Sequence, residues 1–264
     1  MKWIGKIAGG LLGALALGPV GAALGVLVGH QFDEDPPPPP LSADEAARLG
    51  ERFFHSTFRV MGALAKSDGR VSESEIAAAR GIMQELRLDG AQVRAAIECF
   101  GAGKRADFDL DGELETLAQA CQERPQLLRM FFEIQVRAAL AGNDLEGPVR
   151  ALLLRSARAL GISAFEFAHL EAVLRIQRGT FSAGPQPSAA PSGAALAAAY
   201  RVLEVEPAAS DAEVSKAYRR QLQRHHPDKL KANGLPESML AYAQQRTQQI
   251  IEAWELIRAR RGIR

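Results

Sequence analysis

Apolar residues recur along most of this chain at the spacing of a helix face, and runs of β-branched residues are scarce. The pattern predicts an all-α fold. Ser42-Ala43-Asp44-Glu45 is a capping box, and the helix that follows carries one apolar stripe. That stripe is Phe53, Phe54, Phe58, Met61 and Leu64. Further helices are expected at about 72–87, 90–100, 111–122, 124–141, 146–160 and 163–177.

These segments predict a helical bundle over residues 42–178. An apolar group within it, Phe131, Phe132, Ile134 and Val136, predicts that one helix lies at the centre of the bundle. Residues 179–193 are rich in Gly, Ser, Ala and Pro, a composition typical of a flexible linker. A last helical unit is expected at 194–264.

The last unit contains two predicted helices that meet at His226-Pro227-Asp228. A capping box at 210–213 starts the first helix, whose apolar stripe is Val214, Ala217, Tyr218 and Leu222. Pro227 cannot continue that helix, so the tripeptide is expected on an exposed loop. The second helix, at about 237–260, has a matching stripe, which predicts an antiparallel hairpin. The matching stripe is Met239, Ala243, Ile250, Ala253, Trp254 and Ile257.

The first helix of this hairpin also carries a basic surface. Its members are Lys216, Arg219, Arg220 and Arg224. Beside an exposed loop, such a surface suits docking on an acidic partner. Without the tripeptide, the same residues would be typical of an ordinary solvated helix face.

The N-terminus has a different pattern. After a short segment at 1–6, residues 7–29 contain no charge and are long enough to cross a bilayer as a helix. A cleaved signal peptide is the alternative, but the run lacks a small-residue cleavage site and ends in acidic residues. We therefore expect a retained single transmembrane helix. The five prolines in the spacer at 30–41 predict a stiff, extended connection to the bundle.

Glycines in the predicted span recur four residues apart. Residues at that spacing share a helix face, and glycine lets two helices approach closely in lipid. The pattern is consistent with a homodimer through this face, and equally with the general abundance of small residues in membrane helices. The glycines are Gly9, Gly13, Gly21, Gly25 and Gly29.

Composition and charge narrow the functional classes. The 264 residues carry a net charge of +1, which gives no general attraction for nucleic acid. Cys99 and Cys121 lie in predicted helices without metal-ligand spacing, and are expected to be buried thiols. No nucleotide-binding glycine loop or nucleophile–base pattern is present, so neither an enzyme nor a cofactor is expected.

The tripeptide and its neighbours resemble the J domain of DnaJ-type co-chaperones. The matching stretches are 200–203, 209–214, 216–220 and 225–229. The resemblance implies that His226, Pro227 and Asp228 engage a DnaK-type chaperone and stimulate its ATP hydrolysis. It also implies that Lys229 and the basic surface of the preceding helix meet acidic chaperone surface.

Three features depart from the common J-domain pattern. Ser215 stands where a basic residue is frequent, and Thr247 stands where a core Phe is frequent. Residues 229–236, after the tripeptide, form a longer segment than usual. That length, together with Trp3-Ile4-Gly5-Lys6 before the predicted span and residues 29–33 after it, resembles the DjlA family of membrane-anchored co-chaperones.

The middle bundle resembles TerB-like helical domains. The resemblance rests on an Asp-Gly motif in residues 65–75, with a degraded second copy at 142–146. Asp68 is a weak candidate for a metal ligand through this motif, since hard cations favour oxygen ligands. The favoured interpretation is that Asp68 and Ser72 cap a turn and the next helix.

The main functional hypothesis is a membrane-anchored co-chaperone of a DnaK-type chaperone. The J domain implies a cytoplasmic body in a bacterial inner membrane, with a periplasmic N-terminus. Lys2 and Lys6 favour the opposite orientation, but two lysines make a weak bias. The alternative hypothesis is a dimerising envelope-stress sensor or scaffold, whose TerB-like domain binds a partner or metal.

Overall fold

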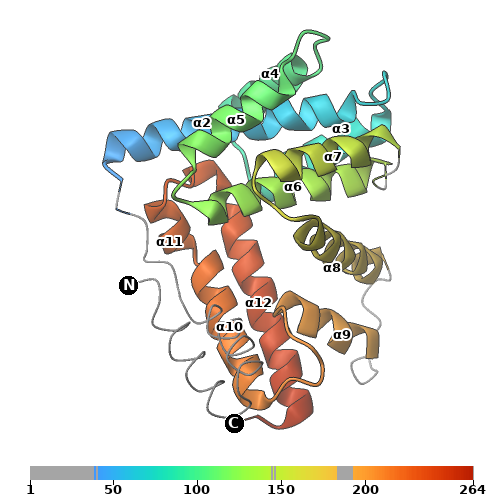
Figure 1. Ribbon diagram of the computed structural model, residues 1–264, viewed down its shortest axis with the longest axis vertical. Helices are drawn as coiled ribbons and strands as arrows, with labels where there is room; N and C mark the ends of the chain where they lie inside the picture. Colours follow the sequence, from blue (N-terminus) through green and yellow to red (C-terminus); the bar gives the residue numbers. More distant parts are fainter. Residues whose placement is uncertain (1–38, 40, 144, 146, 183–192, 264) are drawn as a thin grey trace, which may run out of the picture. The chain divides into compact units, whose positions relative to one another are not determined.

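The computed structural model describes residues 39, 41–143, 145, 147–182 and 193–263. The chain divides into a unit of residues Met1–Pro39 and a unit of residues Pro40–Arg264. The described part of the second unit is helical, without strands, as predicted (Figure 1). The predicted span and its glycines lie outside the described residues. Within those described residues, no helix combines the length and apolar character that crossing a bilayer requires.

The first bundle, which we call the body, runs from α2 to α8. Predicted and observed helices agree in number and order. The C-terminal end of α8 lies beyond the predicted start of the linker at residue 179, so the helix is longer than its pattern indicated. The elements are α2 (Ala43–Ala65), α3 (Glu73–Glu85), α4 (Gly90–Gly103), α5 (Leu110–Ala120), α6 (Pro125–Asn143), α7 (Pro148–Ala159) and α8 (Ala164–Ser182).

Helix α6 is the central element of the body, as its apolar sequence predicted. It packs against α2, α3, α7 and α8 (Figure 1). Phe131 meets Phe53 of α2 edge to face with ring centroids 6.0 Å apart, and Phe132 meets Phe167 of α8 at 5.4 Å. All four rings are at most 1% exposed. Each such side chain buries a large apolar area, so these pairs anchor the core.

Helices α2 and α4 pack closely because glycine lies at both contact points. A Cβ added to Gly62 would collide with the main chain of Phe100, and one added to Gly103 would collide with the main chain of Arg59. No side chain fits between the two backbones there. The sequence alone did not predict this contact.

The second bundle, which we call the J unit, comprises α9 (Gly193–Val202), α10 (Asp211–His225), α11 (Pro227–Ala232), the 3-10 helix η1 (Glu237–Met239) and α12 (Leu240–Arg261). Helices α10 and α12 form the predicted hairpin, and Tyr218 stacks on Trp254 with centroids 4.9 Å apart. The predicted second helix at 237–260 is therefore divided, with a 3-10 turn before α12.

The apolar stripe predicted for α12 does not face one core. Ile250, Ala253 and Ile257 pack with α9 and α10 in the core of the J unit. Met239 and Ala243 instead belong to the core that includes the body. The prediction of a single inner stripe was wrong here, because helical period identifies a buried face without identifying what covers it.

The close contact between α2 and α4 gives a stability prediction. Gly103→Ala should lower the free energy of unfolding by more than about 2 kcal/mol, because the added methyl overlaps main-chain atoms. Gly101→Ala in the same helix is the matched control, since nothing lies within 4 Å of its added Cβ. It should raise stability by about 0.5–1 kcal/mol. Urea unfolding measures both, and equal effects would contradict the close-packing explanation.

Candidate functional site

The tripeptide lies where α10 ends and α11 begins. Ser210 accepts the N–H of Glu213 in the predicted capping box and starts α10. His226 has extended backbone angles, φ −61° and ψ 125°, and ends that helix. Pro227 then begins α11, so the predicted loop is in fact the junction of two helices. Proline suits the first position of a helix, because no N–H is needed there and its φ is already helical.

His226 caps the helix that follows it. Its Nδ1 accepts the N–H of Asp228 at 3.2 Å, which leaves Nε2 as the protonated nitrogen of the neutral ring. The side chain of His226 is 47% exposed, and that of Asp228 is 91% exposed. The junction therefore presents an N–H donor and a carboxylate acceptor, side by side, to solvent.

The basic surface predicted for α10 is present on that helix. Lys216, Arg219 and Arg224 are exposed and Arg220 is half-buried. Glu204, between α9 and α10, lies 3.5 Å from Arg224 and 3.9 Å from Arg220. One carboxylate thus compensates part of the surface nearest the tripeptide. Lys229, exposed on α11, adds a positive charge on the other side.

The flanks of the tripeptide are held in place. Thr247 of α12 donates its hydroxyl to the main-chain oxygen of His225 at 2.9 Å, which satisfies a carbonyl at the end of α10. Leu230, two residues after Asp228, is only 1% exposed. Thr247, noted in the sequence as a departure from a core Phe, thus fixes the approach to the junction.

Charged side chains meet where α12 packs against α6 and α3, and Glu133 and Arg246 are buried there. Glu133 of α6 lies 3.7 Å from Nε of Arg246 and 3.8 Å from Nη2 of Arg137. Arg137 also reaches Glu85 of α3 at 3.2 Å and lies over the ring of Tyr242, 5.1 Å from its centroid. We call these five residues, Glu85, Glu133, Arg137, Tyr242 and Arg246, the seam.

The electrostatics of the seam extend to His225, the residue before the tripeptide. Burial alone would raise the pKa of Glu133, but Arg246 and Arg137 outweigh it and the pKa is lowered. Burial, followed by the charge of Arg246, lowers the pKa of His225 to about 4. His225 is therefore neutral at pH 7 in the folded protein. The seam could not be predicted from the sequence, since its α12 members lie more than a hundred residues after its α6 members.

The remaining candidates have structural roles. Asp68 accepts the N–H of Arg70 at 3.1 Å, and Ser72 forms a capping box with Glu75, as the favoured interpretation of this motif predicted. In the part of the chain that the structure describes, no group of His, Cys, Asp and Glu has the arrangement of a metal site. Cys99 and Cys121 are buried free thiols, as expected.

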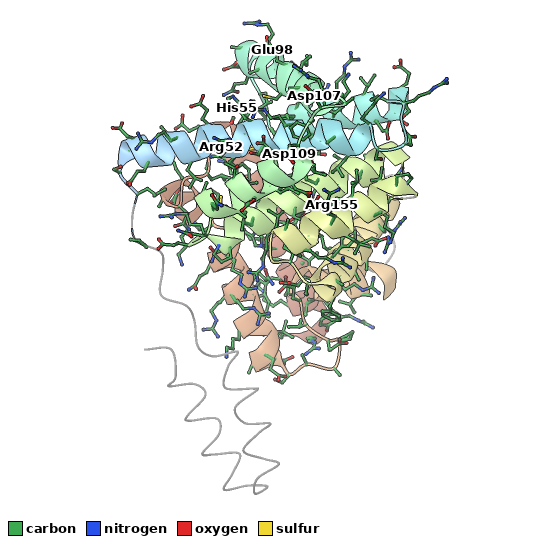
Figure 2. All side chains as sticks on the ribbon, turned by 45° about the horizontal axis from the view of Figure 1, so that its top comes forward. Arg52, His55, Glu98, Asp107, Asp109 and Arg155 are labelled. Carbon is green, nitrogen blue, oxygen red and sulfur yellow. The ribbon has the colours of Figure 1, made fainter. Side chains whose placement is uncertain are left out.

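A second polar surface lies on the body, over α2, α4, α5 and α7. Figure 2 shows Arg52 and His55 of α2 on this side together with Glu98, Asp107, Asp109 and Arg155. Its charges have both signs, and two of them are paired locally, Asp107 with Arg105 and Arg155 with Asp111. This surface provides neither a single-sign field nor a ligand cluster.

Comparison with known proteins accounts for this arrangement. Residues 198–261 match the DnaJ domain, residues 56–172 match "Tellurite resistance protein TerB", and residues 1–52 match "Co-chaperone DjlA transmembrane domain". The Co-chaperone protein DjlA of Coxiella burnetii is 41% identical over the whole of both chains. This chain belongs to the DjlA family of co-chaperones.

Other relatives agree in length as well as sequence. DjlA of Legionella pneumophila is 38% identical over 98% of this chain and 96% of its own, and DjlA of Escherichia coli K12 is 37% identical over the whole of both. No solved structure matches the chain. The resemblances seen in the sequence are thus confirmed, and the co-chaperone hypothesis is favoured over the sensor or scaffold. DnaJ-type proteins are regulators of other proteins. The transmembrane-domain match supports membrane anchoring.

The lowered pKa of His225 gives a pH prediction. Its ordinary value of 6.5 applies when the chain is unfolded, so between pH 6.5 and about 4 the unfolded chain binds the extra proton. Stability should therefore fall as pH drops through this window, by up to about 3 kcal/mol from this residue. Denaturant unfolding of the wild type and His225→Gln at pH 7, 5.5 and 4 measures it. The wild type should lose more stability than the variant, whereas parallel pH profiles would refute the assignment.

Proposed function

We propose that this co-chaperone stimulates ATP hydrolysis by a cytoplasmic DnaK-type chaperone through His226, Pro227 and Asp228. The observation that carries the proposal is the geometry of the junction. A donor and an acceptor are exposed side by side, while His225 before them is hydrogen-bonded to Thr247 and Leu230 after them is buried. A site whose groups are already held in position loses little freedom on binding, which favours recognition by a partner.

The basic residues are proposed to guide the chaperone to the junction. Lys216, Arg219, Arg220 and Arg224 lie on α10, and Lys229 lies on α11. Charges of one sign around a docking point accelerate encounter with an acidic surface more than they strengthen the final complex. Arg219 would contribute more at first contact than Arg220 and Arg224, because Glu204 already pairs with those two.

The proposed role of the tripeptide is tested by measuring DnaK ATP hydrolysis in the presence of the full-length chain. His226→Gln should abolish stimulation, because the exposed ring and its cap on Asp228 are both lost. His169→Gln, the same substitution on α8, is the control and should stimulate as well as the wild type. Arg219→Ala should weaken stimulation at low salt and matter less at high salt. Full stimulation by His226→Gln would contradict the proposal.

The membrane arrangement is also a proposal. A single span at 7–29 with a periplasmic N-terminus would place the tripeptide in the cytoplasm, where ATP is present. Gly9, Gly13, Gly21, Gly25 and Gly29 would form the contact face of a homodimer. The transmembrane-domain match over residues 1–52 supports an anchor, and glycines four apart support close helix packing.

Both parts of this arrangement can be measured in the same cells. Protease added to spheroplasts should leave the body and J unit intact, because they would lie on the cytoplasmic side of the membrane. Crosslinking in intact membranes should trap a dimer, and Gly21→Leu with Gly25→Leu should reduce it by keeping the helices apart. Digestion of the J unit from outside would refute the topology, and an unchanged dimer fraction would refute the glycine contact.

A further inference from the structure

The segment after the tripeptide is packed against the body. Leu230 and Leu235 are 1% and 3% exposed and lie in the same core as Leu49 and Phe53 of α2. A Cβ added to Gly50 of α2 would lie 3.2 Å from Cβ of Pro236, so the glycine makes room for this contact. The extra length of residues 229–236 is therefore used as a docking segment.

Gly234 completes the docking segment. Its φ of +91° belongs to the region that glycine adopts readily and other residues do not. Leu49 and Leu41 occupy the space into which a side chain at this position would project. The chain can therefore turn back toward Pro236 while staying in contact with the body. Helix α11 thus begins at Pro227 of the tripeptide, and the chain that leaves it is anchored on α2.

The seam holds the opposite flank. Tyr242 and Arg246 of α12 are 1% and 9% exposed, and their charged neighbours Glu133 and Arg137 belong to α6. Removing one member of a buried ion pair leaves an uncompensated charge, which is more costly than the net gain from the pair. The seam thus disfavours any docking of α12 in which Arg246 and Glu133 are separated.

The docking segment and the seam support the two sides of the tripeptide. Thr247 follows Arg246 in sequence and donates a hydrogen bond to the carbonyl of His225. The charges of Arg246 and Glu133 also shift the pKa of His225. Leu230 and Leu235 fix the other side. His226 and Asp228 remain exposed between these two fixed points.

We infer that the body positions the tripeptide, with Gly50, Glu133 and Arg246 as positioning residues that act through α11 and α12. The J unit would then reach full stimulation of the chaperone only while docked on the body. This inference rests on the proposed function and adds a requirement to it. It assigns to the TerB domain a direct part in how the junction is presented, besides any other partner it binds.

The test uses the full-length chain in lipid nanodiscs, with DnaK ATP hydrolysis as one readout and amide hydrogen exchange as the other. Gly50→Leu should push Pro236 off α2, and Arg246→Met should leave Glu133 without one of its partners. Both should reduce stimulation by about tenfold or more, since small misplacements of reacting groups have effects of that order. Exchange should accelerate in residues 229–243 and stay unchanged in α4 and α5, which shows that the body remains folded.

Two controls accompany these variants. Gly81→Ala changes a glycine of the body that has nothing within 4 Å of its added Cβ, and should behave as the wild type. Arg246→Lys keeps a positive charge beside Glu133 and should restore most of the stimulation. A variant that merely destabilised the body would instead accelerate exchange in α4 and α5 together with the docking segment.

Every outcome decides between the alternatives. Undocking with full stimulation would overturn the inference and leave the role of His226 intact. Unchanged exchange in both variants would also overturn it, because these contacts would then not hold the J unit. If the wild type itself does not stimulate DnaK, the proposed function fails, and the exchange data still report whether docking depends on Gly50 and Arg246.

Discussion

The first half of α12 packs against the body, and the buried charge of Arg246 must be paired there. Arg246 reaches the carboxylate of Glu133, which also faces Arg137, and Arg137 in turn reaches Glu85. The buried carboxylate of Glu133 thus lies between two guanidinium groups, and Arg137 also pairs with Glu85, which is exposed. Such a set of charges contributes little net stability compared with apolar packing. Separating a buried charge from its partner, however, costs about 3–5 kcal/mol. Its main physical consequence is that one docked arrangement is favoured over the neighbouring ones.

Because α12 is a continuous helix, the docked arrangement of its first half also sets the position of the rest of the J unit. The same helix ends in the core formed with α9 and α10, through Ile250, Ala253 and Ile257. At its far end, Arg261 donates to the hydroxyl of Tyr200 and the carbonyls of Pro207 and Ala209. The hairpin is therefore fixed at both ends of one rigid element, and the tripeptide is supported from α12 as well as from α2.

Local features of the sequence predicted local structure well. Ser42 and Ser210 start their helices through capping boxes, and the apolar residues Phe131, Phe132, Ile134 and Val136 lie at the centre of the body. These signals depend on neighbours within about one helical turn, which the sequence displays directly. The exposed tripeptide was also predicted, because Pro227 must interrupt α10. That Pro227 starts another helix was missed, although its ring suits that position.

Contacts between distant segments could not be obtained in the same way. Gly62 and Gly103 identify a close crossing of α2 and α4 only once both backbones are placed. Met239 and Ala243 have the same period as Ile250, so the sequence could not assign them to a different core. The pairing of Glu133 with Arg246 likewise depends on how the two bundles meet. For the J unit, the motif identified the exposed groups, and only the fold identified what supports them.

Glu204 shows how that support extends to the basic surface. Its φ of +56° is unfavourable for a residue with a side chain, by about 1 kcal/mol. The N–H of Val205 closes the end of α9 by donating to the carbonyl of Tyr200, which keeps Glu204 in this conformation. Exposed ion pairs such as those with Arg220 and Arg224 stabilise the fold by at most about 1 kcal/mol. The two terms nearly cancel, so these contacts of Glu204 contribute little net stability to the fold.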